Sequence, residues 1–156
     1  MARIPVQEGV HRVGSEEGPR LVEVWEASVR ATHHFLSEAD IQFFKPLVLE
    51  GLLSLEDLLC VRDIAGDLVG FVGVADRRME ALFVHPSWHR VGIGRLLARH
   101  AIVELGVTAV DVNEQNQQAV AFYVRLGFEV HGRSELDSTG KPFPLLHMRL
   151  RNVAER

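Results

Sequence analysis

The chain has 156 residues, a length typical of one domain, and its 47% hydrophobic and 24% charged residues exclude a disordered, collagen-like or coiled-coil protein. A formal net charge of −4 gives no general attraction to nucleic acid or to anionic membranes. The single cysteine, Cys60, cannot form an intramolecular disulfide, and the sequence contains neither a signal-peptide pattern nor an apolar run of transmembrane length. We therefore expect a single cytoplasmic domain over residues 1–156.

The first part of the chain predicts two helices. Residues 15–17 form a capping start, and apolar side chains recur at helical spacing over about 16–30. A short loop, 32–35, follows this first helix. Ser37 and Asp40 then resemble a capping box that opens the second helix.

Apolar runs separated by turn residues predict a sheet. The runs 57–63 and 68–75 flank Gly66-Asp67, which indicates a β-hairpin. The elements expected after this hairpin are a strand over Met79–Val84, a helix over Gly92–Gly106, a strand over Val107–Val112, a helix over Asn116–Leu126 and strands over about 128–135 and 143–150. Helices, a hairpin and then two strand–helix units predict a mixed sheet covered on both faces.

The strongest local motif is a glycine turn that leads into the helix Gly92–Gly106. Gly92 and Gly94 let a ligand approach the unpaired N–H groups at the positive end of this helix. Arg90 and Arg95 lie where guanidinium groups can pair with phosphate oxygens. A pyrophosphate suits this site, although a tight strand-to-helix turn would also explain the glycines. The turn has neither the lysine of a Walker loop nor the third glycine of a Rossmann fingerprint.

Three stretches in consistent order resemble the GCN5-related N-acetyltransferase (GNAT) superfamily. The first is Leu82-x-Val84-x-Pro86 with the following glycine turn, in which His89 stands where the family usually has Gln or Arg. The second is Asn113-Glu114-x-Asn116-x-x-Ala119 followed by Phe122-Tyr123-x-x-x-Gly127-Phe128. The third, residues 132–146, together with residues 31–36, resembles the YjaB-like bacterial branch of the superfamily. The resemblance covers nearly the whole chain.

This resemblance implies an α/β fold with a mixed, mostly antiparallel sheet of about seven strands, flanked by about four helices and splayed between the fourth and fifth strands. Acetyl-CoA, the co-substrate, would lie in the splayed gap, with its pantetheine arm on the backbone of Leu82–Val84 and its pyrophosphate on the glycine turn. The residues expected to bind acetyl-CoA are Leu82, Phe83, Val84, His89, Arg90, Val91, Gly92, Ile93, Gly94, Arg95, Asn116, Ala119 and Phe122. No metal is expected, because the histidines are scattered and match no zinc spacing.

Candidate catalytic groups come from the same motifs. Tyr123 shares a helix face with Asn116, and the family resemblance implies that Tyr123 donates a proton to the leaving sulfur. A buried core tyrosine is the alternative. Glu80, two residues from Leu82 and expected on the same side of its strand, is the candidate base, and a solvated carboxylate is the alternative. His33 and His34 are rival bases because imidazole titrates near neutral pH.

The function implied is acetyl transfer from acetyl-CoA to a primary amine by direct attack on the thioester. Asn113, His33 and Phe35 are expected to contact the acceptor, which is either a small molecule or a peptide amine. Transfer of a different acyl group and a non-catalytic acyl-CoA sensor are the alternatives. The oligomeric state stays open, with a homodimer among the options.

Overall fold

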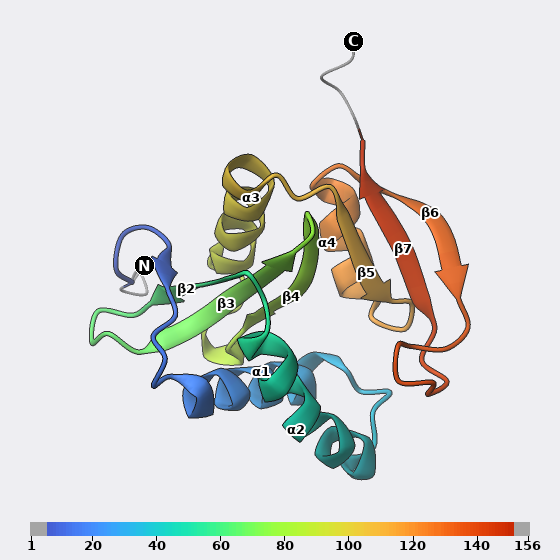
Figure 1. Ribbon diagram of the computed structural model, residues 1–156, viewed down its shortest axis with the longest axis horizontal. Helices are drawn as coiled ribbons and strands as arrows, with labels where there is room; N and C mark the ends of the chain where they lie inside the picture. Colours follow the sequence, from blue (N-terminus) through green and yellow to red (C-terminus); the bar gives the residue numbers. More distant parts are fainter. Residues whose placement is uncertain (1–5, 152–156) are drawn as a thin grey trace.

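The structure, a computed structural model, describes residues 6–151, which form one seven-stranded sheet with helices on both faces (Figure 1). The helices are α1 (Gly18–Thr32), α2 (Glu38–Leu53), the short 3₁₀ turn η1 (Pro86–Trp88), α3 (Ile93–Leu105) and α4 (Gln117–Arg125). The strands are β1 (His11–Arg12), β2 (Asp57–Arg62), β3 (Leu68–Ala75), β4 (Arg78–Val84), β5 (Ala109–Asn113), β6 (Phe128–Ser134) and β7 (Leu145–Leu150). Within residues 6–151, no helix combines the length and apolarity needed to cross a bilayer.

The sheet is splayed between its fourth and fifth strands, as the family resemblance implies. The strand order is β1-β2-β3-β4-β5-β7-β6, and only the β4–β5 pair is parallel. That pair is short, because it joins Arg78 to Ala109 and Met79 to Val110 and no further residues. Figure 1 shows the two strands drawing apart beyond this point. The β5-facing backbone edge of residues 80–84 is therefore left without a strand partner.

Two apolar clusters hold the helices against the two faces of the sheet. On one face, α3 and α4 pack over a cluster that includes Val72, Leu97 and Phe128. On the other face, α1 and α2 cover a cluster that includes Val24 and Phe71. This division leaves α1 and α3 on opposite sides of β4, so that the splayed gap opens toward both helical layers.

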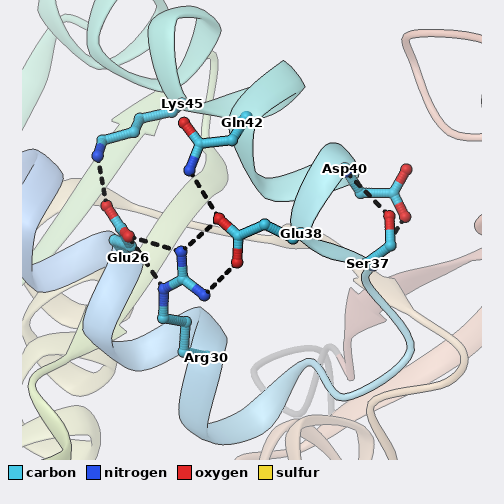
Figure 2. Close-up of polar contacts among 7 residues, drawn as sticks. All are labelled: Glu26, Arg30, Ser37, Glu38, Asp40, Gln42 and Lys45. Carbon is cyan, nitrogen blue, oxygen red and sulfur yellow. Dashed lines mark hydrogen bonds and ion pairs between the residues drawn. The ribbon is translucent and has the colours of Figure 1, made fainter.

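Polar contacts join α1 to α2 and fix the loop between them (Figure 2). The Arg30 guanidinium donates at 2.9 Å to Glu26 and at 2.8 Å to Glu38, while Lys45 lies 2.6 Å from Glu26. The predicted capping box is confirmed, since the Asp40 N–H donates to Ser37 Oγ at 3.1 Å and the Ser37 N–H donates to Asp40 Oδ2 at 2.9 Å. These contacts hold both ends of the segment 33–37.

Three local expectations differ from the structure. Helix α1 begins at Gly18 after Glu17 rather than on a Ser15 cap, because the Glu17 carboxylate accepts the Gly14 N–H and pairs with Arg62. Strand β5 begins two residues later than predicted, because the Val107 N–H still bonds Ala101 O at the end of α3. The two-residue strand β1 was not predicted from the residues. The single-domain prediction for 1–156 extends beyond the described residues.

Candidate active site

A groove of about 780 Å³ runs along the splay between β4 and α4. Its walls come from the end of α1, from β4, from the turn before α3 and from α4. The residues that line it are Ser28, Ala31, Thr32, His33, Leu82, Phe83, Val84, Trp88, His89, Arg90, Gly92, Ile93, Gly94, Arg95, Asn116, Gln118, Ala119, Ala121, Phe122, Tyr123 and Arg125. Nearly all the residues predicted to bind acetyl-CoA are thus brought together. Val91 is the exception, since it lies outside the lining and is 48% exposed.

The glycine turn has the backbone shape of an anion site. Gly92 caps α3 with φ +92°, and Arg90 adopts φ +64°, a conformation that is uncommon for a residue with a β-carbon. A β-carbon built at Gly94 would meet Phe122 and Val84 at 3.8 Å, so protein packing alone does not demand glycine there. The first N–H groups of α3 have no partner inside the helix. The turn therefore fits a phosphate group.

The side chain of His89 holds this turn to the strand. Its Nε2 lies 2.7 Å from the carbonyl oxygen of Val84, the last residue of β4. The ring thereby fixes the distance between the strand end and the N-terminus of α3. This gives His89, the departure from the family pattern, a structural role in shaping the groove.

The groove carries positive charge although the chain as a whole is acidic. Arg90, Arg95 and Arg125 line it, and no Asp or Glu of the described residues does. A ligand with several phosphate groups suits this lining. Sequence reasoning missed Arg125, although its place two residues after Tyr123 in the last turn of α4 was a usable signal.

Helix α4 presents its motif residues to the groove. Asn116 caps the helix by accepting the Ala119 N–H at 3.2 Å. The ring of Tyr123 packs edge-on against Phe128 in the core at 5.7 Å. Within residues 6–151, the Tyr123 hydroxyl makes no hydrogen bond. Every fully buried side-chain nitrogen or oxygen there does make one, so the hydroxyl is not fully enclosed. Tyr123 lines the groove, and burial raises the pKa of its hydroxyl, which keeps the proton in place.

A second, smaller cavity of about 210 Å³ adjoins the groove on the α1–α2 side. Its walls are mainly aromatic and aliphatic, with few polar groups. The residues that line it are Trp25, Val29, His33, Phe35, Leu36, Phe44, Val48, Phe83, Asn113, Asp137, Ser138, Phe143 and Leu145. The three residues predicted to contact the acceptor, His33, Phe35 and Asn113, all belong to it.

His33 and Phe83 line both cavities, and their rings lie 6.4 Å apart. The junction of the two spaces is therefore built by the α1–α2 loop on one side and by β4 on the other. Burial, with a smaller effect of His34, lowers the pKa of His33 to about 4, so that the ring is neutral near pH 7. His34 lines neither cavity.

The second cavity also has walls from the loop between β6 and β7 and from α2, which contribute Asp137, Phe143 and Phe44. Asp137 does shape the loop between β6 and β7, because its Oδ1 accepts the backbone N–H groups of Thr139 and Lys141. Lys141 of the same loop lies over the ring of Phe43, 4.4 Å from its centroid, and does not line the cavity. Phe44 of α2 was missed, since one helical apolar residue among many carries no distinguishing signal.

The prediction that Glu80 shares the side of Leu82 is wrong. A bulge in the β3–β4 ladder pairs Gly73 with Ala81 and Val74 with Met79, so that Glu80 has no opposite residue and the alternation breaks. Glu80 lies 3.6 Å from Arg78, which in turn contacts Asp111, and Glu80 lines neither cavity. Burial raises the pKa of Glu80, and Arg78 opposes that effect.

A metal centre finds no support in the part of the chain that the structure describes. No group of three or more His, Cys, Asp or Glu side chains gathers there in a way that could hold a metal ion. Cys60 is buried in β2, and burial raises the pKa of its thiol to about 11, which suits a packed apolar side chain.

Comparison with known proteins places this site in a family. The family "Acetyltransferase (GNAT) domain" matches residues 28–151. The chain is 42% identical over 139 residues to the peptidyl-lysine N-acetyltransferase YjaB of Salmonella typhimurium, covering 89% of this chain and 95% of that protein. The YjaB protein of Escherichia coli is 41% identical over the same length.

Solved structures agree with these relatives. The solution structure of apo YjaB from Escherichia coli superposes with a TM-score of 0.81 at 40% identity, covering 90% of this chain and 95% of that one. The PaiA N-acetyltransferase of Thermoplasma acidophilum, solved with coenzyme A, has a TM-score of 0.68 at 20% identity and shares the fold over 92% of this chain and 98% of its own. The chain therefore belongs to the GNAT family of N-acetyltransferases, in its YjaB-like branch.

Proposed function

We propose that the chain transfers the acetyl group of acetyl-CoA to the side-chain amine of a lysine in a peptide or protein. The observation that carries this proposal is the meeting of two unlike cavities at His33 and Phe83. One cavity is a long cationic groove suited to a polyphosphate ligand, and the other is a short apolar cavity suited to an alkyl chain. Acyl transfer requires such a junction, because the thioester and the amine must reach each other.

The groove supplies what acetyl-CoA needs. Backbone N–H groups of Ile93, Gly94 and Arg95 would hold the pyrophosphate, and Arg90 and Arg125 would pair with further phosphate oxygens. The unpaired backbone edge of Leu82–Val84 would bond the amides of the pantetheine arm as an added strand does. Asn116 would contact the same arm from α4.

The chemical step needs two functions beyond binding. Negative charge develops on the thioester oxygen during attack by the amine, and a backbone N–H of the Leu82–Val84 edge would stabilise it. The departing thiolate is then protonated by Tyr123, which lines the groove. Acetyl-CoA supplies the activated acetyl group.

The second cavity supports lysine as the acceptor. Its volume of about 210 Å³ lies below the range of about 300–1,000 Å³ usual for sites that hold drug-sized ligands. Aromatic walls such as Phe35 and Phe143 suit the methylene stem of one long side chain. The relatives named peptidyl-lysine N-acetyltransferases give independent support.

Amine acetylation by the purified protein tests this proposal. We expect an N-terminally blocked peptide with one lysine to gain one acetyl group by mass spectrometry while free thiol is released from acetyl-CoA. The matched control is the same peptide with norleucine in place of lysine, which keeps the methylene stem and lacks the amine. A peptide whose only amine is its N-terminus and a polyamine complete the panel.

Two outcomes would contradict the proposal. Acetylation of the polyamine or of the peptide N-terminus in preference to lysine would show that the protein is an acetyltransferase with a different class of acceptor. Tight binding of acetyl-CoA without transfer to any amine would instead favour an acyl-CoA sensor.

A further inference from the structure

The loop between α1 and α2 contains a hydrogen-bonded chain that determines which nitrogen of His33 carries its proton. The Thr32 hydroxyl donates its one proton to the carbonyl oxygen of Ser28 at 2.8 Å, within the last turn of α1. Thr32 Oγ1 also lies 2.7 Å from His33 Nδ1. A carbonyl oxygen only accepts, so both contacts are satisfied when Nδ1–H donates to the Thr32 oxygen.

The other ring nitrogen is consequently left as an acceptor. In a neutral imidazole with Nδ1 protonated, Nε2 carries a lone pair. Within residues 6–151, Nε2 makes no hydrogen bond to the protein. Every fully buried side-chain nitrogen or oxygen there does make one, so Nε2 is not fully enclosed. The ring of His33 lines both cavities, so a group bound where they join can meet it.

The surroundings of the ring keep it in this state. Phe35 and Phe83 lie beside it, with ring centroids 5.4 and 6.4 Å away, and neither carries charge. His34 is its neighbour in the chain, and Asp137, which shares the second cavity with it, is engaged in its own turn. The titratable groups that line the groove together with His33 are His89, Arg90, Arg95, Tyr123 and Arg125. Burial favours the neutral ring, so Nε2 remains available at working pH.

Building on the proposed function, we propose that His33 Nε2 accepts the proton of the acceptor amine, and that Thr32 is the positioning residue that fixes the required tautomer. The lysine ammonium first loses one proton to solvent, and as the neutral amine nitrogen forms its bond to the thioester carbon, a second N–H proton passes to Nε2. The C–S bond then breaks and the thiolate takes the Tyr123 proton. Solvent in the groove returns the His33 proton to Tyr123, so the net transfer is one proton from nitrogen to sulfur.

The tautomer is tested directly by nitrogen NMR. In uniformly ¹⁵N-labelled protein near pH 7, the His33 signals, assigned by their loss in His33→Phe, should show a protonated Nδ1 and an unprotonated Nε2. In Thr32→Val the fixed tautomer should be lost, because valine keeps the shape of the side chain and removes the hydroxyl. A protonated Nε2 in the parent protein would overturn the assignment whatever the activity data show.

Turnover of the lysine peptide tests the catalytic part. We expect His33→Phe to lower kcat by about 10²-fold, within the usual range for general acid–base catalysis, with acetyl-CoA binding retained. Thr32→Val should lower kcat about tenfold, and Thr32→Ser, which restores the hydroxyl, should recover most of that loss. His131→Phe is the matched control, since it makes the same change at an exposed histidine of β6 outside both cavities, and it should keep the parent turnover.

Three activity results would contradict the inference. A kcat of His33→Phe within threefold of the parent would remove His33 from the proton transfer. A larger loss in Glu80→Gln than in His33→Phe would assign the proton to Glu80. Equal losses in Thr32→Val and Thr32→Ser would mean that Thr32 acts through packing. Absence of parent activity with every amine would refute the proposed function instead, and the NMR result would still decide the tautomer.

Discussion

Gly94 stands opposite Phe122 across the groove, and a β-carbon added to Gly94 would lie 3.8 Å from the ring, an ordinary contact distance. Gly94→Ala should therefore fold without strain, and the helix should gain up to about 1 kcal/mol because alanine replaces glycine. The same methyl group would occupy the space into which a phosphate must fit. We expect acetyl-CoA affinity to fall about 10- to 100-fold, as measured by calorimetry.

Gly51→Ala is the control for this change. Gly51 lies in α2, and a β-carbon built there meets no atom within 4 Å. It should raise or preserve the melting temperature and leave acetyl-CoA affinity at the parent value. Equal affinity in both variants would contradict a phosphate site at Gly94.

Tyr123→Phe separates the hydroxyl from the ring. The ring packs against Phe128, whereas the hydroxyl makes no hydrogen bond within the described residues, so the melting temperature should change little. If the hydroxyl protonates the thiolate, kcat should fall by about 10²-fold with acetyl-CoA affinity retained. Single-turnover thiol release measures the chemical step, and a rate within twofold of the parent would identify Tyr123 as a core tyrosine only.

Sequence patterns predicted the features that depend on a single segment, such as the glycines at the ends of α3 and the residue spacing along α4. Gly92 and Gly106 both have positive φ at the two ends of α3, as glycines at helix boundaries commonly do. The spacing of Asn116 and Tyr123 placed both on the groove side of α4 because a helix fixes that geometry. The glycine turn before α3 could therefore be recognised without knowledge of any distant contact.

The parts that were missed depend on contacts between distant segments. The predicted side of Glu80 assumed strict alternation along β4. One extra residue in the β3–β4 ladder places Glu80 on the opposite side, and no residue type in β4 signals this bulge. Helix α1 begins at Gly18 rather than near residue 16, and Glu17 at its N-cap pairs with Arg62, 45 residues away. The second cavity joins Phe44, Asn113 and Phe143 from three segments, and only the fold brings them together.

Asn113→Ala tests the acceptor side of the junction. Asn113 lies at the end of β5 and lines only the smaller cavity, away from the glycine turn. We expect the KM for the lysine peptide to rise about tenfold, as loss of one or two polar contacts would cause, with the KM for acetyl-CoA nearly unchanged. Equal increases of both constants would mean that Asn113 supports the fold or the co-substrate instead.

The depressed pKa of His33 predicts a specific dependence of stability on pH. The pKa is about 4 in the folded protein and 6.5 in the unfolded chain, so the unfolded state binds an extra proton between these values. The contribution of His33 is therefore fully present above about pH 6.5 and is lost as the pH falls toward 4. The full difference corresponds to about 3 kcal/mol of unfolding free energy.

Urea unfolding of the parent protein and of His33→Phe, at intervals from pH 7.5 to about pH 4, measures this contribution. Phenylalanine cannot titrate, so the free energy of unfolding should fall more steeply in the parent than in the variant as the pH decreases. His85, whose pKa burial also lowers, is common to both proteins and cancels in the comparison. Parallel curves for the two proteins would show that His33 has an ordinary pKa in the folded state and that its ring is not held neutral by burial.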